Sequence, residues 1–290
     1  MVEIVVTQEA GRRWDAVADE VRAVTAGLAE RVGRRTGLGL GPELHVRLLN
    51  PDAYALAHEA HERRVNEALL ASDLLYAIPD QARRLRLEAD LRRADGSYSG
   101  GNRKFGCLPS SRAVPGTDGG STILLVPALL RRSAGTVSRD ALRSVLAHQL
   151  VHQAQFALWG PSLSMDLRAA HLVHRATRAA VEEFRSLSAV LEGHALFTTR
   201  ELLAADYVEE RKAGRLLRLL WGPNRGLAVY DRGEDCVRKA VEYGVTDLLL
   251  RLRADPTLVP DRRELLDPDG WVARLTTADE PVRQEPAGPA

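Results

Sequence analysis

The chain has 290 residues, of which 45% are hydrophobic and 27% are charged. These values are ordinary for globular proteins and exclude a disordered, collagen-like or disulfide-scaffold chain. The 40 Lys and Arg residues balance the 39 Asp and Glu residues, so the net charge of +1 gives no support for nucleic-acid binding. At about 150 residues per domain, the length predicts two domains, with one large domain as the alternative.

Nothing in the sequence points to export or to a membrane. The first residues lack the basic and apolar regions of a signal peptide. The longest apolar run, Ile123–Leu130, is far shorter than the roughly 18 residues of a spanning helix. The two cysteines, Cys107 and Cys236, stand outside any CxxC spacing and do not resemble a secreted disulfide framework. We therefore expect a cytoplasmic protein with no membrane contact.

The N-terminal part begins with helical spacing. Within the first 40 residues, apolar side chains recur every three or four positions, which predicts a helix with one buried face. These side chains are Trp14, Val17, Val21, Val24 and Leu28. The glycines of Gly37–Gly41 end this helix, Leu44–Leu49 predicts a strand, and a long helical zone follows from Pro51 to Arg93.

A glycine-rich region separates this zone from the strongest strand signal. Asp95–Gly120 holds seven glycines and two prolines, which predicts an irregular loop or a hairpin. Residues 121–126, STILLV, follow as the best strand candidate, and we expect this strand to lie at the edge of a sheet. Residues 1–136 should therefore form a mixed helical and strand part.

From Ser138 onward the sequence predicts mainly helices. Ser138 is a suitable N-cap for a helix that ends near Leu158, before a Gly-Pro pair. Two further helices are predicted, over about 166–187 and about 188–205, and more helices follow in the C-terminal third.

These helices define the expected domain organisation. Residues 137–277 should form a helical part that carries the functional site. Residues 278–290, which contain three prolines, should form a flexible tail. We expect a mostly α fold with a small β-sheet, of the α+β class.

The segment LAHQLVHQAQF, from Leu146 to Phe156, carries the main chemical signal. It places His148 and His152 at i and i+4, so both imidazoles lie on one face of a helix and can bind one tetrahedral zinc ion. In the HExxH signature the next residue is a glutamate that takes a proton from the attacking water, but here it is Gln149. The spacing alone also fits two histidines without a metal.

Two further features favour a metal site. The helix is apolar almost all round, which indicates a buried helix whose imidazoles need partners. A later segment, AVLEGHALF, supplies Glu192 and His194 at a distance of 192 − 152 = 40 residues from the second histidine. In an ideal helix these two side chains point about 200° apart, so only one faces the metal easily. We favour Glu192 as the ligand, and His194 is its rival or a nearby polar group.

The two motifs together resemble those of a known family. LAHQLVHQAQF followed by SAVLEGHALF is similar to the zinc-metallopeptidase-like proteins of actinobacteria that are linked to biosynthesis of a deazaflavin coenzyme. The stretches Tyr230–Gly244 and Val259–Leu275 also follow the pattern of that family. The resemblance covers about Ser138–Leu275. Gln149 departs from it, because the family carries the general-base glutamate at this position.

The resemblance implies a zincin-like layout of the gluzincin type, with zinc as the cofactor and peptidase chemistry. It implies His148, His152 and Glu192 as the metal ligands, and it places an extended peptide along the edge strand of the sheet. Gln149 stands at the position of the general base, and His194 lies beside the ligands. The partner is then a peptide or small-molecule substrate, and the oligomeric state stays open.

Three interpretations of Gln149 remain open. It is a substitution introduced to trap an inactive peptidase, or it marks a natural zinc-binding pseudo-enzyme. In the third interpretation the protein is a non-hydrolytic zinc enzyme of small-molecule metabolism. In each of them hydrolysis of a peptide by the chain as written is impaired, because a neutral amide cannot hold the proton.

Other histidines and acids are weaker metal candidates. His58 with His61 and His171 with His174 each stand three residues apart, but neither pair has an apolar helix followed by a later acid. The second pair could instead line the cleft near the main site. Glu183 is the reserve ligand if the register of the later helix differs.

Three further residues are candidates for substrate contacts. Tyr207 and Tyr230 could donate a hydrogen bond to an oxyanion. Arg200, eight residues after the glutamate of AVLEGHALF, could contact a substrate carboxylate or an acid of the cleft, although a surface arginine is the simpler interpretation.

Overall fold

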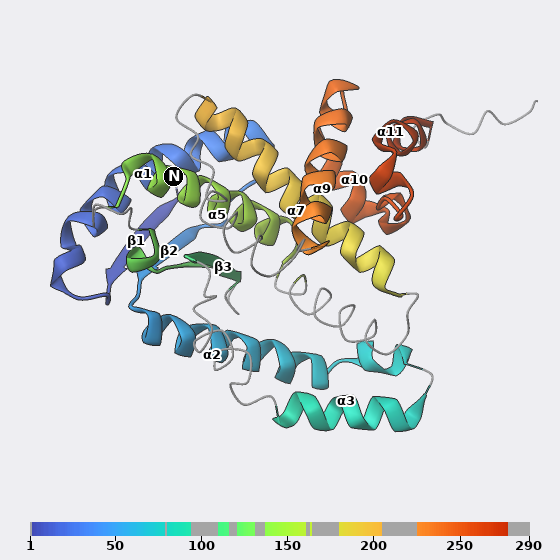
Figure 1. Cartoon of the computed structure of the whole chain (residues 1–290), viewed down its shortest axis with the longest axis horizontal. Helices are drawn as coiled ribbons and strands as arrows, with labels where there is room; N and C mark the ends of the chain where they lie inside the picture. Colours follow the sequence, from blue (N-terminus) through green and yellow to red (C-terminus); the bar gives the residue numbers. More distant parts are fainter. Residues whose placement is uncertain are drawn as a thin grey trace, which may run out of the picture.

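The structure is a computed structural model, and it describes residues 2–78, 80–93, 110–115, 121–130, 137–160, 163, 180–204 and 225–277. This part of the chain is mostly helical and contains one small mixed sheet (Figure 1). The α+β class predicted from the sequence is thereby confirmed. Among these residues, no helix combines the length and the apolar character needed to cross a membrane.

The sheet has four strands in the order β1-β2-β4-β3. Strands β1 (Glu3–Gln8), β2 (Glu43–Leu48) and β4 (Ser121–Leu125) run parallel, whereas β3 (Ser111–Pro115) is antiparallel to β4. The strand expected at 121–126 is present, but its expected edge position is wrong. The glycine-rich region before it supplies β3, which pairs with the other side of β4 and is the edge strand among the described strands.

The chain begins with strand β1, whereas the sequence predicted helical structure from the first residues. Helix α1 spans Asp15–Thr36 and ends at Gly37, whose φ of 68° is in the left-handed region that glycine tolerates best. The residues before α1, EIVVTQ, instead pair with β2 in parallel register, with Glu3 beside Glu43. Strand β2 confirms the strand predicted at 44–49.

Helices cover both faces of the sheet (Figure 1). On one face α1 packs against α5 (Arg139–Trp159), and on the other face lies α2 (Pro51–Leu70), with α3 (Gln81–Arg93) beside it. The face under α2 buries a small apolar cluster of Leu49, Tyr54, Val114, Leu124 and Val126. Arg112, on the same side of β3 as Val114, therefore faces α2, whereas the neighbouring Ala113 faces α5.

Helix α5 confirms the predicted helix that carries both histidines of LAHQLVHQAQF. The hydroxyl of Ser138 accepts a hydrogen bond from the backbone N–H of Ala141 at 3.4 Å, which is the predicted N-cap. The helix ends at Gly160, whose φ of 78° stops further helical hydrogen bonding.

Helix α7 spans Ala180–Leu203 without a break. The boundary predicted between 187 and 188 is therefore wrong, because no glycine or proline stands there and the apolar face continues through Ala189 and Val190, both fully buried. The start predicted near 166 lies outside the described residues.

Helix α9 (Arg225–Glu242) packs closely against α7, and α10 (Leu248–Ala254) and α11 (Pro268–Thr277) complete the C-terminal part. One hydrophobic core contains side chains from both sides of residue 136, for example Val21 of α1 and Trp271 of α11. The domain boundary at 136/137 stays a prediction, and the tail 278–290 lies outside the described residues. Short 3-10 turns are at Arg12–Trp14, Asp73–Ala77, Pro127–Leu130, Pro256–Leu258 and Glu264–Leu266.

Candidate metal centre

Three side chains predicted as metal ligands meet between α5 and α7. The Nε2 atoms of His148 and His152 lie 3.1 Å apart. Oε2 of Glu192 lies 3.5 Å from the first of these nitrogens and 3.6 Å from the second. The structure thus brings together two residues one helical turn apart and a third from a helix 40 residues later (192 − 152 = 40).

The dimensions of this group fit a small divalent cation. A tetrahedral zinc ion with bonds of about 2.1 Å holds neighbouring ligand atoms about 3.4 Å apart. The three observed separations lie on both sides of that value. This His148-His152-Glu192 group is the metal-ligating cluster found among the described residues, and it could hold a metal ion. Two imidazoles and one carboxylate leave a fourth position open.

The charges of the group suit metal binding. Burial by itself would raise the pKa of Glu192, but the adjacent His152 and His148 hold this pKa well below its ordinary value. Burial by itself would lower the pKa of His152, but the charge of Glu192 and hydrogen bonds with it and with Gln155 raise it. The carboxylate is therefore ionised, which is the form that binds a cation. Its side chain is 34% exposed, so the group is open to solvent on this side.

Gln149, the residue at the general-base position, is buried beside the edge strand. Its Oε1 accepts a hydrogen bond from the backbone N–H of Ala113 at 2.6 Å. Because Val126 donates to the carbonyl of Ser110, the alternation of an antiparallel pair turns the N–H of Ala113 away from β4 and toward α5. Gln149 therefore satisfies a backbone donor on the outer edge of β3.

His194 does not join the metal-ligating group. Its Nδ1 lies 3.3 Å from Nε2 of Gln155, a buried residue of α5. Burial, followed by the charges of His152 and Arg35, lowers the pKa of His194 to about 3, so this imidazole is neutral. Of the two rivals in the later helix, the structure brings Glu192 to the histidines.

Gln155 is a residue that the sequence-based prediction missed. Its Oε1 lies 2.8 Å from Nδ1 of His152, and its Nε2 donates to the carbonyl of Leu191 at 2.8 Å. A signal for it exists in the sequence: a glutamine three residues after a ligand histidine, within an apolar helix, lies one turn away and can reach the ring.

The pair His58 and His61 is on α2, on the opposite face of the sheet from α5. His58 hydrogen-bonds Arg112 through Nε2, and that arginine also lies 3.4 Å from Glu62. Burial, followed by the charge of Arg112, lowers the pKa of His61 to about 4. These residues form no metal-ligating group of three within the part of the chain described.

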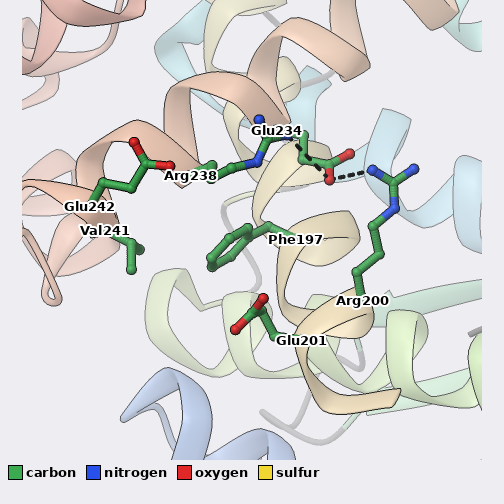
Figure 2. A pocket seen from close by; sticks show the side chains of 7 residues that line it. All are labelled: Phe197, Arg200, Glu201, Glu234, Arg238, Val241 and Glu242. Carbon is green, nitrogen blue, oxygen red and sulfur yellow. Dashed lines mark hydrogen bonds and ion pairs between the residues drawn. The ribbon is translucent and has the colours of Figure 1, made fainter. Parts of the chain in front are cut away.

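Arg200 lies in a separate open pocket of about 450 Å³ between α7 and α9. It forms an ion pair with the buried Glu234, which Arg238 also approaches at 3.8 Å (Figure 2). Arg200 does contact an acid, but this acid belongs to α9 and not to the His148-His152-Glu192 group, so the predicted contact with an acid of that cleft is not what the structure shows. The pocket is lined by Phe197, Arg200, Glu201, Glu234, Arg238, Val241 and Glu242.

The remaining candidates lie outside the described part of the structure. His171, His174 and Tyr207 lie outside the described residues. The side chains of Glu183 and Tyr230 also lie outside the described part, although both positions belong to helices.

Comparison with known proteins identifies no relative. No family model matches the chain, and neither the curated proteins nor the solved structures contain a significant match. The resemblance carried by LAHQLVHQAQF and SAVLEGHALF therefore stays an expectation.

Proposed function

We propose that the protein binds one zinc ion at His148, His152 and Glu192 on a zincin-like scaffold, as a metallopeptidase-type protein whose hydrolysis is impaired. The observation that carries the proposal is the set of three ligand atoms 3.1 to 3.6 Å apart, from α5 and α7. Two histidines, one carboxylate and one open position are typical of catalytic rather than structural zinc sites.

The surroundings of the site support the same layout. The antiparallel edge strand β3 packs against α5, the helix that carries both histidines. The resemblance places an extended peptide along such an edge. The N–H of Ala113 is already bonded to Gln149, however, so a peptide added to β3 would make fewer main-chain hydrogen bonds than on an open edge.

Gln149 determines how the site can act. Zinc bound there would polarise a carbonyl group and lower the pKa of a water molecule. A backbone N–H can only donate, so the atom of Gln149 that faces Ala113 is the carbonyl oxygen, and the amide hydrogens are what this side chain can offer elsewhere. Gln149 can thus donate a hydrogen bond through its amide but cannot take up a proton, and the loss of a general base costs about 10²- to 10⁴-fold in rate.

The same observation favours a second candidate function. In the proposed layout, the N–H groups of Gln149 beside a bound cation would suit the binding of an anionic oxygen, such as a carboxylate, without cleavage. The protein would then be a zinc-dependent binding protein for a peptide or a small molecule. Turnover separates the two candidates, because only the first predicts slow cleavage of a peptide by the chain as written.

Metal analysis tests the proposal. The purified protein, equilibrated with zinc and then freed of excess metal, should retain about one zinc ion per chain. His148→Ala and His152→Ala should abolish retention. His45→Ala, on β2 beside Glu43, is a matched control that should retain the metal. A wild-type protein that binds no zinc would refute the proposed function. Equal zinc retention in the wild type and in His148→Ala and His152→Ala would refute it as well.

A further inference from the structure

A single buried carboxamide connects the two helices of the metal centre. Gln155 on α5 is 1% exposed and contacts three groups, of which two belong to α7. Its distances are 2.8 Å to Nδ1 of His152, 2.8 Å to the carbonyl of Leu191 and 3.3 Å to Nδ1 of His194. The two histidines on either side of it therefore share one amide group.

The carbonyl of Leu191 fixes the orientation of this amide. A carbonyl can only accept, so the atom of Gln155 that faces it is the NH₂ group. The other end, Oε1, can only accept and faces Nδ1 of His152, which must then carry a proton. A neutral imidazole protonated at Nδ1 has its lone pair on Nε2, the atom that lies within the metal-ligating group.

The second hydrogen of the same NH₂ group determines the tautomer of His194. It points to Nδ1 of His194, which must accept and is therefore unprotonated. The proton of the neutral ring is then on Nε2. Neither nitrogen of His194 is free to bind a cation, because one lone pair is engaged by Gln155 and the other nitrogen carries hydrogen.

We propose that Gln155 is a positioning residue that fixes opposite tautomers in two histidines, making His152 an Nε2 ligand and His194 an Nε2–H donor outside the ligand set. This inference rests on the proposed metal binding, which it deepens. The half-buried His194 then offers its N–H to an acceptor oxygen of a bound molecule. One buried amide thus acts together with the opposed directions of the two side chains to favour Glu192 over His194 in the coordination of the ion.

Two substitutions separate the two roles of the amide. Gln155→Glu keeps an acceptor for His152 but removes the donor to His194 and to the carbonyl of Leu191, whereas Gln155→Leu removes the acceptor as well. We expect the zinc affinity to fall about 10- to 100-fold in Gln155→Leu, as for other outer partners of ligand histidines, and to stay near the wild-type value in Gln155→Glu. Gln153→Leu is the matched control, since Gln153 is fully buried on α5 and its carboxamide has no hydrogen-bond partner among the described residues.

Nitrogen-15 NMR of the imidazoles in the metal-free wild-type protein tests the assignment without any variant. We expect the Nδ1–H tautomer for His152 or its protonated form, and the Nε2–H tautomer for His194. An Nδ1–H tautomer at His194 would overturn the inference, as would equal zinc affinities of Gln155→Leu and the wild type, or equal losses in Gln155→Leu and Gln155→Glu. A wild type that binds no zinc would instead refute the proposed function, while the tautomer measurement still decides the inference.

Discussion

Gly193 of α7 and Gly233 of α9 meet backbone against backbone. A Cβ atom on Gly193 would lie 2.1 Å from the carbonyl carbon of Gly233, and one on Gly233 would lie 1.8 Å from the carbonyl oxygen of Ala189. Neither distance leaves room for a methyl group. Because Gly193 directly follows Glu192, this crossing fixes the turn of α7 that presents the carboxylate to α5.

Gly193→Ala should therefore damage both the fold and the metal centre. The added methyl meets backbone atoms that cannot rotate away, and we expect it to destabilise the protein by about 3 kcal/mol, the upper end of the usual overpacking range. Urea unfolding and zinc titration measure the two effects. Gly27→Ala on α1 is the control, because a Cβ there has open space, and it should be neutral or stabilising by up to about 1 kcal/mol. Equal effects of the two substitutions would contradict the tight crossing.

Glu192 and His194 should respond differently to truncation. Glu192→Ala removes one of the three ligand atoms, and we expect it to weaken zinc binding strongly. His194→Ala should leave most of the zinc in place and alter ligand affinity or turnover, because this ring contacts Gln155 rather than the ligand group. Metal content after gel filtration measures both. Loss of the metal in His194→Ala with retention in Glu192→Ala would invert the assignment.

Gln149→Glu should create or strengthen hydrolysis. A carboxylate oxygen can still accept from the N–H of Ala113, so the position of the side chain is retained while a base is added. We expect peptide cleavage to rise at least about 100-fold with unchanged zinc content, which corresponds to about 3 kcal/mol of activation barrier. A mixed peptide library, assayed with both forms in parallel, provides the measurement.

Two outcomes of this assay would contradict the role of residue 149 as the general base or the peptidase function, and Gln149→Ala tests its structural role. Equal activity of the two forms would mean that residue 149 is not the base. Absence of cleavage by either form, with zinc present, would favour the binding protein over the peptidase. Gln149→Ala, which leaves the N–H of Ala113 without this partner, should lower the free energy of unfolding by about 1–3 kcal/mol.

His61 should make the protein less stable in acid. In the unfolded chain its pKa is near 6.5, whereas burial and then Arg112 lower it to about 4 in the folded protein. Below about pH 6.5 the unfolded state therefore binds more protons, so stability falls as the pH drops toward about 4, by roughly 3 kcal/mol in total. His61→Gln should remove this part of the pH dependence of urea unfolding.

The two histidines of the candidate metal centre could be predicted from the sequence because their pairing depends on local spacing, whereas the choice of Glu192 also needed the resemblance to a known family. His148 and His152 stand one helical turn apart on any helix, and the opposed directions of Glu192 and His194 follow from helix geometry alone. The carboxamide of Gln155 escaped prediction because its importance arises only where α5 and α7 meet, and its contact with Leu191 joins residues 36 positions apart.

The sheet shows the corresponding limit for the fold. STILLV marks a strand by its apolar run, but its inner place in the sheet depends on β2, far away in the sequence, and on β3, in the glycine-rich stretch just before it. β3 is short, contains an arginine and a proline, and lies in a glycine-rich stretch, so its own residues carry little strand signal. β1 forms its strand hydrogen bonds with β2, about 40 residues later. The helical spacing of the residues between the two strands hides this pairing in the sequence.

The hydrogen bond between Gln149 and Ala113 also bears on the solubility of the protein. Edge strands with free N–H groups recruit strands of other copies and lead to aggregation. On the outer side of β3, the N–H of Ala113 is capped by a side chain and Pro115 has no N–H, which leaves that of Ser111 as the donor of this edge. The side chain at the predicted general-base position therefore also occupies a backbone donor through which the sheet could pair with another strand.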